Sequence, residues 1–362
     1  MKNFVPPPFK PDLLIRGGHL QTLASLRAPG QQIAADANHV VELPDGDAIV
    51  LHENAAVDGG VVAAGQSAGQ SAGQSFASEV DRAVPSGDRV SGDRVSGDRI
   101  VVLFHGLSGC HGSPYMIRLA GRFVRLGWTV YRVDMRGCGA ARDLSRGLSH
   151  AGRSEDVMAA LDFVARRHPD SQLAAVGVSL GGNQLLRLAG RVGAGLDARP
   201  EWFDRLERIA VVAPPIDLVR CSENMERLSR RLYNYYFIRA LFERIAPAVR
   251  EREHFQKIAS LGRPKTLLEL DDRLTAPLSG FQGALEYYRQ CGATHVTASN
   301  PVKTLVLAAK DDPIVPADCF LNARWPDRTR VLLTTTGGHA GFVGRQRSYW
   351  MDDCLIAWLN RL

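Results

Sequence analysis

A serine flanked by glycines is the residue of this chain whose setting best suits covalent chemistry. Ser179 stands in the run Gly177-Val178-Ser179-Leu180-Gly181. The apolar segment 173–178 before it predicts a strand, and residues 180–192 after it predict a helix. A serine on a tight strand-to-helix turn, with small residues that let the backbone pass closely, is the setting of a nucleophile. We therefore expect Ser179 to be one; a serine at an ordinary glycine-rich helix start is the alternative.

A serine hydroxyl is a weak nucleophile and needs a histidine that accepts its proton. His339 stands in the run TTTGGHAGF, directly after a strand predicted at residues 330–335. The two glycines before it predict a loop, which lets the imidazole reach the carboxyl edge of the sheet. We expect His339 to be this base.

A carboxylate must orient the histidine, and two neighbouring aspartates compete for that role. Asp311 and Asp312 follow the strand predicted at residues 303–309. The spacing D-x-x-x-P favours Asp312, whereas Asp311 would serve if the strand ended one residue earlier. The other aspartate is expected to cap the following turn. Asp217, which follows a strand predicted at 208–213, is a third candidate.

Two backbone N–H groups must stabilise the negative charge that develops on the attacked carbonyl oxygen. One is expected from Leu180, directly after the nucleophile, and the other from Leu107, in the loop HGLSG that follows the strand predicted at 99–104. His105 in the same loop follows a different strand from the one expected to supply the base. We therefore expect a structural role for His105.

Composition and motifs give no sign of a cofactor or of a macromolecular partner. Of the 362 residues, 45% are hydrophobic, and the net charge of +6 is spread along the chain, which argues against a nucleic-acid partner. The six cysteines lack metal-binding spacing, and no phosphate-binding, dinucleotide or HExxH motif is convincing. We expect no cofactor, no metal, no transmembrane helix and a cytoplasmic location. Nothing in the sequence indicates an oligomeric state.

Strands and helices alternate along most of the chain, and this pattern predicts an α/β fold. The mostly parallel sheet is expected to carry helices on both faces. Predicted strands and helices lie at 99–104, 114–126, 128–134, 154–168, 173–178, 180–192, 208–213, 303–309, 330–335 and 349–362.

We expect one domain over residues 1–362, with three additions. Residues 1–38 predict an irregular arm, which is followed by a hairpin at 39–54 with an Asp-Gly turn. Residues 57–98 repeat GQSA and SGDRV and predict a low-complexity insertion. Residues 218–291 interrupt the alternation with mostly helical sequence, which we interpret as a lid. Its aromatic cluster, Tyr233 to Phe237, is expected to pack inside the lid, with a substrate-facing wall as the alternative.

Several motifs together resemble the YheT-like branch of the α/β-hydrolases, which includes plant embryogenesis-associated and animal abhydrolase-domain proteins. The matching runs cover most of residues 10–362 in order: GGHLQTL, FHGLSGCHGSPYM, DMRGCG, GVSLGGNQLL, LELDDRLTAPLSGF, YYRQCG, AAKDDPIVP and GGHAGF. Cys110 and His111 stand where such proteins often have small polar residues. The resemblance implies a Ser–Asp–His hydrolase that acts on small-molecule or lipid-like esters.

Three hypotheses on function follow. The first is a serine carboxylesterase that works through an acyl-enzyme. The second is an acyltransferase or a lipase acting on long acyl chains, for which the lid would form an apolar tunnel. The third is a non-catalytic binding protein that keeps the fold.

Overall fold

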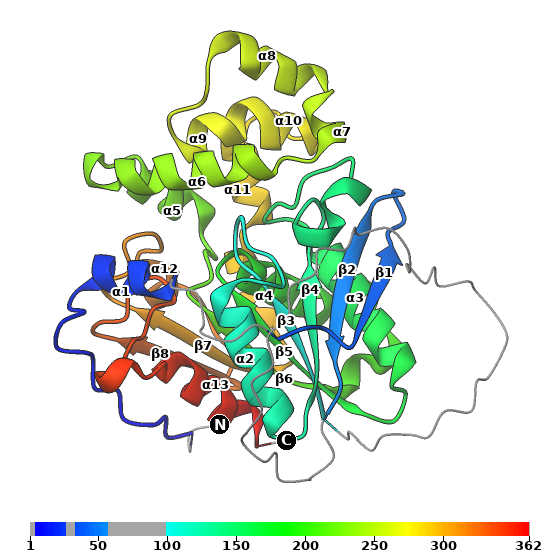
Figure 1. Ribbon diagram of the computed structural model, residues 1–362, viewed down its shortest axis with the longest axis vertical. Helices are drawn as coiled ribbons and strands as arrows, with labels where there is room; N and C mark the ends of the chain where they lie inside the picture. The colour runs from blue at the N-terminus through cyan, green and yellow to red at the C-terminus, as the bar shows by residue number, and fades with distance from the viewer. Residues whose placement is uncertain (1–3, 27–32, 57–98, 362) are drawn as a thin grey trace, which may run out of the picture.

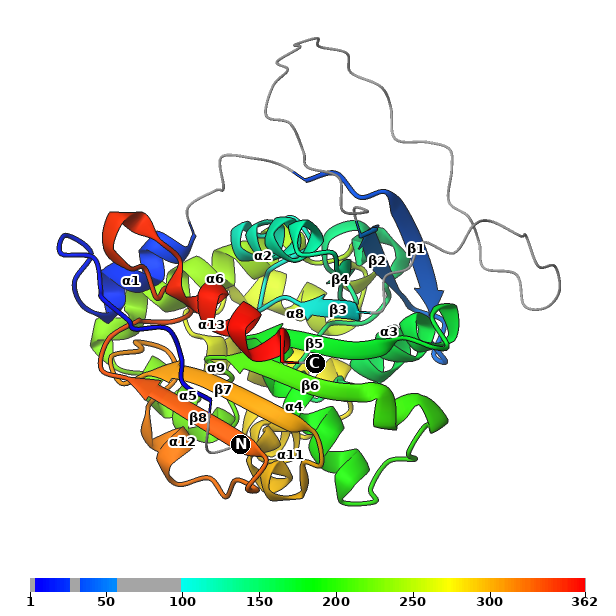
Figure 2. The same ribbon diagram turned by 90° about the horizontal axis from the view of Figure 1, so that it is seen from below.

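A twisted sheet forms the centre of the computed structural model, which describes residues 4–26, 33–56 and 99–361 (Figures 1 and 2). Within these residues eight strands lie in the order β1-β2-β4-β3-β5-β6-β7-β8. β1 and β2 form an antiparallel hairpin, β2 is antiparallel to β4, and the other neighbours are parallel. The strands are β1 Ala37–Glu42, β2 Ala48–Asn54, β3 Arg99–Phe104, β4 Thr129–Asp134, β5 Gln172–Val178, β6 Leu206–Val212, β7 Lys303–Ala309 and β8 Thr329–Thr334. The predicted, mostly parallel sheet is confirmed.

Helices cover both faces of this sheet, which is why its central strands are apolar on both sides (Figure 2). In β3, Val102 and Phe104 pack into one core with residues of α3 and α4, while Val101 and Leu103 pack into the other with residues of α2 and α13. The helices are α1 Gly18–Ser25, α2 Pro114–Arg125, α3 Ser154–Arg167, α4 Leu180–Gly193, α5 Leu218–Met225, α6 Arg231–Arg244, α7 Pro247–Arg250, α8 Glu253–Leu261, α9 Leu267–Leu270, α10 Ala276–Leu278, α11 Ala284–Cys291, α12 Asp318–Leu321 and α13 Trp350–Leu359.

The segment between β6 and β7 forms an inserted helical lid. Its helices α5 to α11 lie beyond the edge of the sheet at which the parallel strands end (Figure 1). Part of the lid has a hydrophobic core of its own, to which α6, α7, α8, α9 and the π-helical turn Asp271–Thr275 contribute buried side chains. This edge is also where loops from successive parallel strands meet, so the lid covers the predicted site.

The N-terminal arm differs from the expected irregular segment. It contains the helix α1, and β1 already begins at Ala37. This helix was not predicted from the sequence, because Gly17 and Gly18 stand at its start and glycine has a low helix propensity. Contacts with distant residues hold it instead, as described below. The repeats at 57–98 lie outside the described residues.

Most element ends lie within two residues of the prediction. β6 ends at Val212 rather than at residue 213, because Ala213 has a φ of 47°, which a strand cannot accommodate. The last helix, α13, ends at Leu359. Among the described residues, no helix combines the length and the apolar composition that crossing a bilayer requires.

Candidate active site

Ser179 lies on a strained turn between β5 and α4. Its φ of 52° is in the left-handed region, which residues other than glycine rarely adopt. The backbone around it is fixed on both sides, since Ser179 N donates to Val212 O of β6 and Asn183 N donates to Ser179 O. Strain that the surrounding structure holds in place clusters at functional sites.

The glycines beside Ser179 are required by close backbone contact. A Cβ on Gly177 would lie 2.5 Å from Gly181 O, and a Cβ on Gly181 would lie 2.6 Å from His105 O. Atoms this close would overlap, so any side chain would push β5, α4 and the loop after β3 apart. The motif therefore packs the turn against the loop that is expected to supply the second N–H group.

His339 connects Ser179 to a carboxylate. Its Nδ1 lies 2.9 Å from Asp312 Oδ2 and its Nε2 lies 2.9 Å from Ser179 Oγ. An ionised carboxylate can only accept, so Nδ1 carries the proton and donates to Asp312. Nε2 then has a free lone pair and accepts from the Ser179 hydroxyl, which is the arrangement in which a histidine can deprotonate a serine.

The two neighbouring aspartates make different contacts. Asp312 turns its second oxygen, Oδ1, to the N–H groups of Ile314 and Val315, which hold the carboxylate in place. Asp311 Oδ1 accepts from Gly338 N at 2.9 Å, so this side chain supports the loop that carries His339. Asp217 caps α5, where it accepts from Arg220 N, and has no hydrogen bond to His339.

Leu107 lines both cavities at Ser179, and Leu180 lines the smaller of the two. Among the described residues, neither backbone N–H donates to an acceptor. Both N–H groups are therefore free to receive a ligand oxygen. Next to Leu107, Gly106 N donates to the hydroxyl of Tyr115, the second residue of α2, which follows this loop.

His105 lies fully inside the protein and bonds only to backbone. Its Nδ1 donates to Gly106 O at 2.8 Å, and its Nε2 accepts from Met135 N at 3.2 Å. Burial lowers the pKa of His105, which fits a neutral ring held between two loops. These contacts agree with the structural role expected for it.

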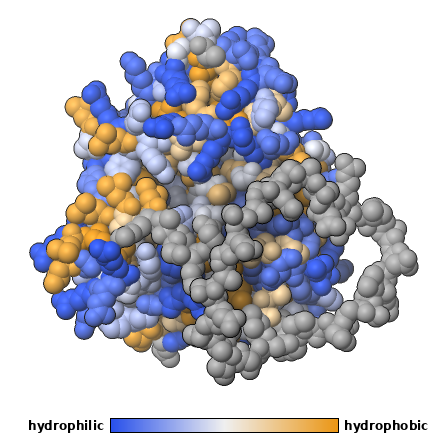
Figure 3. Space-filling view, viewed as in Figure 1, coloured by the Kyte–Doolittle hydropathy of each residue, from blue (hydrophilic) through white to orange (hydrophobic). Residues whose placement is uncertain are grey.

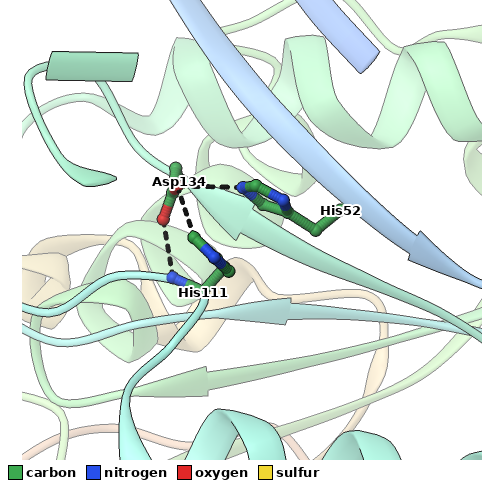
Figure 4. A group of neighbouring side chains, drawn as sticks. All are labelled: His52, His111 and Asp134. Atoms are coloured by element: carbon green, nitrogen blue, oxygen red, sulfur yellow. Dashed lines mark hydrogen bonds and ion pairs between the residues drawn. The ribbon is translucent and has the colours of Figure 1, made fainter. Parts of the chain in front are cut away.

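Sequence reasoning missed a cluster that holds the outer part of the loop after β3. Asp134, at the end of β4, accepts from the backbone N and ring Nδ1 of His111 and from His52 of β2 (Figure 4). It also accepts from Ala140 N. Burial alone would raise the pKa of Asp134, but hydrogen bonds from the two histidines lower it. In the sequence, the signal for this cluster was Asp134 itself, the aspartate of the DMRGCG run.

The same three side chains could offer ligands to a metal ion, since one atom of each lies within 4.8 Å of the others. However, the rings of His52 and His111 are stacked, with centroids 3.6 Å apart and an interplanar angle of 22°. An imidazole binds a metal through a lone pair in its ring plane, at about 2.0–2.1 Å for zinc. One ion cannot lie near the planes of two stacked rings, so this arrangement suits hydrogen bonds to Asp134 better.

The N-terminal arm fixes the loop of His339, which sequence reasoning also missed. Thr22 Oγ1 accepts from His339 N at 2.8 Å. The fully buried Gln21 donates to Ile15 O and Val343 O and accepts from Val343 N. The GGHLQTL run was a signal for this contact, but nothing local shows that it meets a loop more than 300 residues away.

Two pockets meet at Ser179. The first, which we call the lid pocket, has a volume of about 150 Å³ and lies between Ser179 and the lid. The second, the arm pocket, has a volume of about 650 Å³ and lies between α1, α6 and the loop after β3. Both are lined by Leu107, Ser179, Phe237 and Ile314.

The lid pocket is mostly apolar, but the buried His150 and the half-buried Asp271 also line it. Burial lowers the pKa of His150 to about 3, so this ring is neutral at ordinary pH. Burial raises the pKa of Asp271 to about 6. Tyr288 donates to Asp271 Oδ2 at 2.7 Å. Apart from Asp271, the side chains that line this pocket are uncharged near neutral pH.

The aromatic cluster of α6 does not pack inside the lid as expected. Tyr233, Tyr236 and Phe237 line the arm pocket, and Tyr235 is 65% exposed. The buried positions of α6 are instead Asn234, Ile238 and Phe242, which follow one another at helical spacing. The aromatic residues lie on other sides of the helix, and three of them face a cavity at Ser179 rather than the lid core.

Comparisons with known proteins agree with this architecture. A family model described as the alpha/beta hydrolase fold matches residues 99–345, which include Ser179, both aspartates and His339. YheT of Escherichia coli, which is named as an esterase, is 31% identical over 269 residues that cover 72% of this chain and 76% of that protein.

Two eukaryotic relatives are more distant. The medium-chain fatty acid ethyl ester synthase/esterase 2 of Saccharomyces cerevisiae is 27% identical over 72% of this chain and 62% of its own length. Phospholipase ABHD3 of Mus musculus is 25% identical over 70% of this chain and 60% of its own length. The chain therefore spans less than two thirds of these two relatives. The names of all three proteins refer to enzymes that act on esters.

Proposed function

Because this chain belongs to the α/β-hydrolase family, in its YheT-like branch, we propose that it is a serine hydrolase that cleaves carboxylic esters through an acyl-enzyme. The observation that carries the proposal is the hydrogen-bonded series from Ser179 through His339 to Asp312, with both distances at 2.9 Å. The strained turn at Ser179 and the two free N–H groups beside it support the same chemistry.

In the first half of the reaction, Ser179 Oγ attacks the ester carbonyl carbon while His339 Nε2 takes the hydroxyl proton. Asp312 holds the imidazole and stabilises its positive charge. The N–H groups of Leu107 and Leu180 stabilise the negative carbonyl oxygen. The tetrahedral intermediate then expels the alkoxide, which takes the proton from His339 and leaves as the alcohol.

In the second half, water attacks the acyl carbon and His339 accepts a proton from it. The second tetrahedral intermediate expels Ser179 Oγ, to which His339 returns the proton, and the free acid leaves. An alcohol in place of water would give acyl transfer instead, so the two reactions share every residue named here.

The two pockets support an assignment of the two halves of the ester. The apolar lid pocket suits the acyl chain, and the larger arm pocket suits the alcohol. The lid pocket, at about 150 Å³, is much smaller than the arm pocket, at about 650 Å³. We therefore expect preference for acyl chains of medium length, rather than the long chains of the lipase hypothesis.

The test is hydrolysis of p-nitrophenyl esters of increasing chain length, together with fluorophosphonate labelling, by the unmodified protein and by Ser179→Ala. We expect labelling and turnover by the unmodified protein only, with a maximum in the medium-chain range. Full activity in Ser179→Ala would refute the mechanism. A folded protein that neither labels nor turns over any ester would favour the non-catalytic alternative.

A further inference from the structure

Apolar side chains gather on the surface where α1 meets the beginning of α6. Figure 3 shows hydrophobic residues over both elements. On α6, Leu232, Tyr235 and Tyr236 lie on one side of the helix by their spacing, and Leu228 precedes them by one turn. Seven side chains, between 46% and 81% exposed, form what we call the arm–lid surface: Leu20, Leu23, Leu26, Leu228, Leu232, Tyr235 and Tyr236.

The two halves of this surface are joined by direct contact. His19 of α1 and Tyr233 of α6 are hydrogen-bonded at 2.9 Å through Nδ1 and the phenol oxygen, and their rings stack. Arg230 Nη1 lies 3.4 Å from the other ring nitrogen of His19. The exposed side chains therefore form one surface across two elements that are about 200 residues apart in sequence.

This surface borders the opening to the candidate nucleophile. Leu23, Leu26, Leu232 and Tyr236 line the arm pocket, which extends to Ser179. Single exposed leucines are ordinary on protein surfaces. Several exposed apolar side chains around one pocket indicate a binding site for an apolar partner. An apolar molecule that reaches Ser179 through the arm pocket passes these side chains.

Positive charges accompany the apolar side chains. Arg16, Arg227 and Arg231 are exposed, and among the described residues no carboxylate lies within ion-pair distance of them. Arg239 lies on the apolar side of α6 and pairs with Glu243. Glu226 is the exposed acid next to Arg227. The net charge of these exposed residues is therefore positive.

We propose that the arm–lid surface binds the protein to the interface of an anionic phospholipid bilayer, with the arm pocket facing the lipid. Leucine and tyrosine side chains would enter the interfacial region while the arginines meet anionic headgroups, a combination typical of proteins that lie on membranes. The inference goes beyond ester hydrolysis and does not depend on it, because binding needs no reaction at Ser179.

The charges favour a bilayer over a second copy of the chain. A symmetric dimer through this surface would bring Arg227 and Arg231 of both copies close together, and like charges across an interface oppose association. Anionic headgroups neutralise the same arginines. Binding to a bilayer should therefore weaken with salt, because screening reduces the attraction of the arginines.

The experiment is co-sedimentation of the full chain with vesicles of phosphatidylcholine, either alone or mixed with phosphatidylglycerol. We expect binding to the mixed vesicles, weaker binding to the neutral ones, and release by salt. Leu228→Ser combined with Leu232→Ser should lower partitioning about tenfold or more, since two inserted side chains lose their apolar contact. Ser179→Ala should bind like the unmodified protein.

The matched control is Leu196→Ser combined with Leu321→Ser, two leucines that are 58% and 69% exposed and lie outside α1 and α6. This variant should bind vesicles normally. Equal binding by both double variants, or no binding by the unmodified protein, would overturn the proposal. So would a dimer, seen by light scattering without lipid, that the Leu228 and Leu232 substitutions dissociate. Hydrolysis of a water-soluble ester, measured separately, shows whether the proposed catalysis stands.

Discussion

At the scale of single residues, Asp311 and Asp312 are adjacent in sequence but have different surroundings. The side chain of Asp312 is fully buried and touches His339, while Asp311 holds the backbone of Gly338. The sequence favours Asp312 by its distance from Pro316 but does not exclude its neighbour. Side chains of successive residues leave the backbone in different directions, so only the three-dimensional course of the turn separates the two.

We expect Asp312→Asn to lower kcat/KM about 10⁴-fold, because an amide no longer holds His339 in the proton-accepting form. Asp311→Asn keeps an oxygen for Gly338 N and should change kcat/KM by less than about tenfold. Steady-state kinetics on a soluble ester compares the two. The reverse order of the two effects would transfer the proposed role to Asp311.

Asp271 makes the stability of the protein depend on pH. The pKa of this carboxyl is raised from 3.8 to about 6 in the folded protein, so the folded state holds the proton more tightly than the unfolded state. The resulting stability is fully present below about pH 4 and is lost as pH rises through about 6. The difference is at most about 3 kcal/mol.

Asp271→Asn, which does not ionise, should therefore gain stability relative to the unmodified protein between pH 4 and 7. Urea unfolding at several pH values measures this difference. Asp272→Asn, an exposed neighbour, serves as the control. An equal pH dependence in the unmodified protein and in Asp271→Asn would show that another group is responsible.

At the scale of elements, the buried strands were the easiest to predict and the arm the hardest. The run RIVVLF and the run KTLVLAA become β3 and β7 with the expected bounds, because continuous apolar residues between polar turns have few alternatives. The helix α1 is short and begins with two glycines, and distant contacts hold it. Local patterns contain no information about such contacts.

The same distinction applies to the candidate site. Ser179, His339 and the aspartate pair were found because each directly follows a predicted strand, where a parallel sheet collects its loops. Thr22 and Asp134 position loops from a distance, so no spacing rule locates them. The sequence did not show which side of α6 packs into the lid core, so it could not predict that the tyrosines point away from that core.

Gln21 offers a test of the arm. We expect Gln21→Ala to destabilise the fold by about 1–3 kcal/mol, since it leaves the buried N–H group of Val343 without a partner, whereas Val343 O keeps its bond from Asp12 N. The exposed Gln290→Ala should have little effect. Urea denaturation of both variants provides the comparison. If the two were equally stable, the arm would not hold the His339 loop through this side chain.

At the scale of the whole molecule, the proposed site is assembled from both ends of the described chain. The arm crosses to the C-terminal region, where Phe4 packs edge-on against Trp358 and Trp350 donates to Pro7 O (Figure 1). The sheet supplies Ser179, and the lid and arm supply the walls of the two pockets. No single element forms a pocket without the others.

The bond between Thr22 and His339 also has a consequence for the order of events during folding. It joins residues 317 positions apart, so it requires closure of a very long loop, whereas the turn at Ser179 depends mainly on neighbouring strands. Such distant contacts form slowly. During refolding, circular dichroism should therefore recover first, and the capacity of Ser179 to react with a fluorophosphonate should return in a later, slower phase.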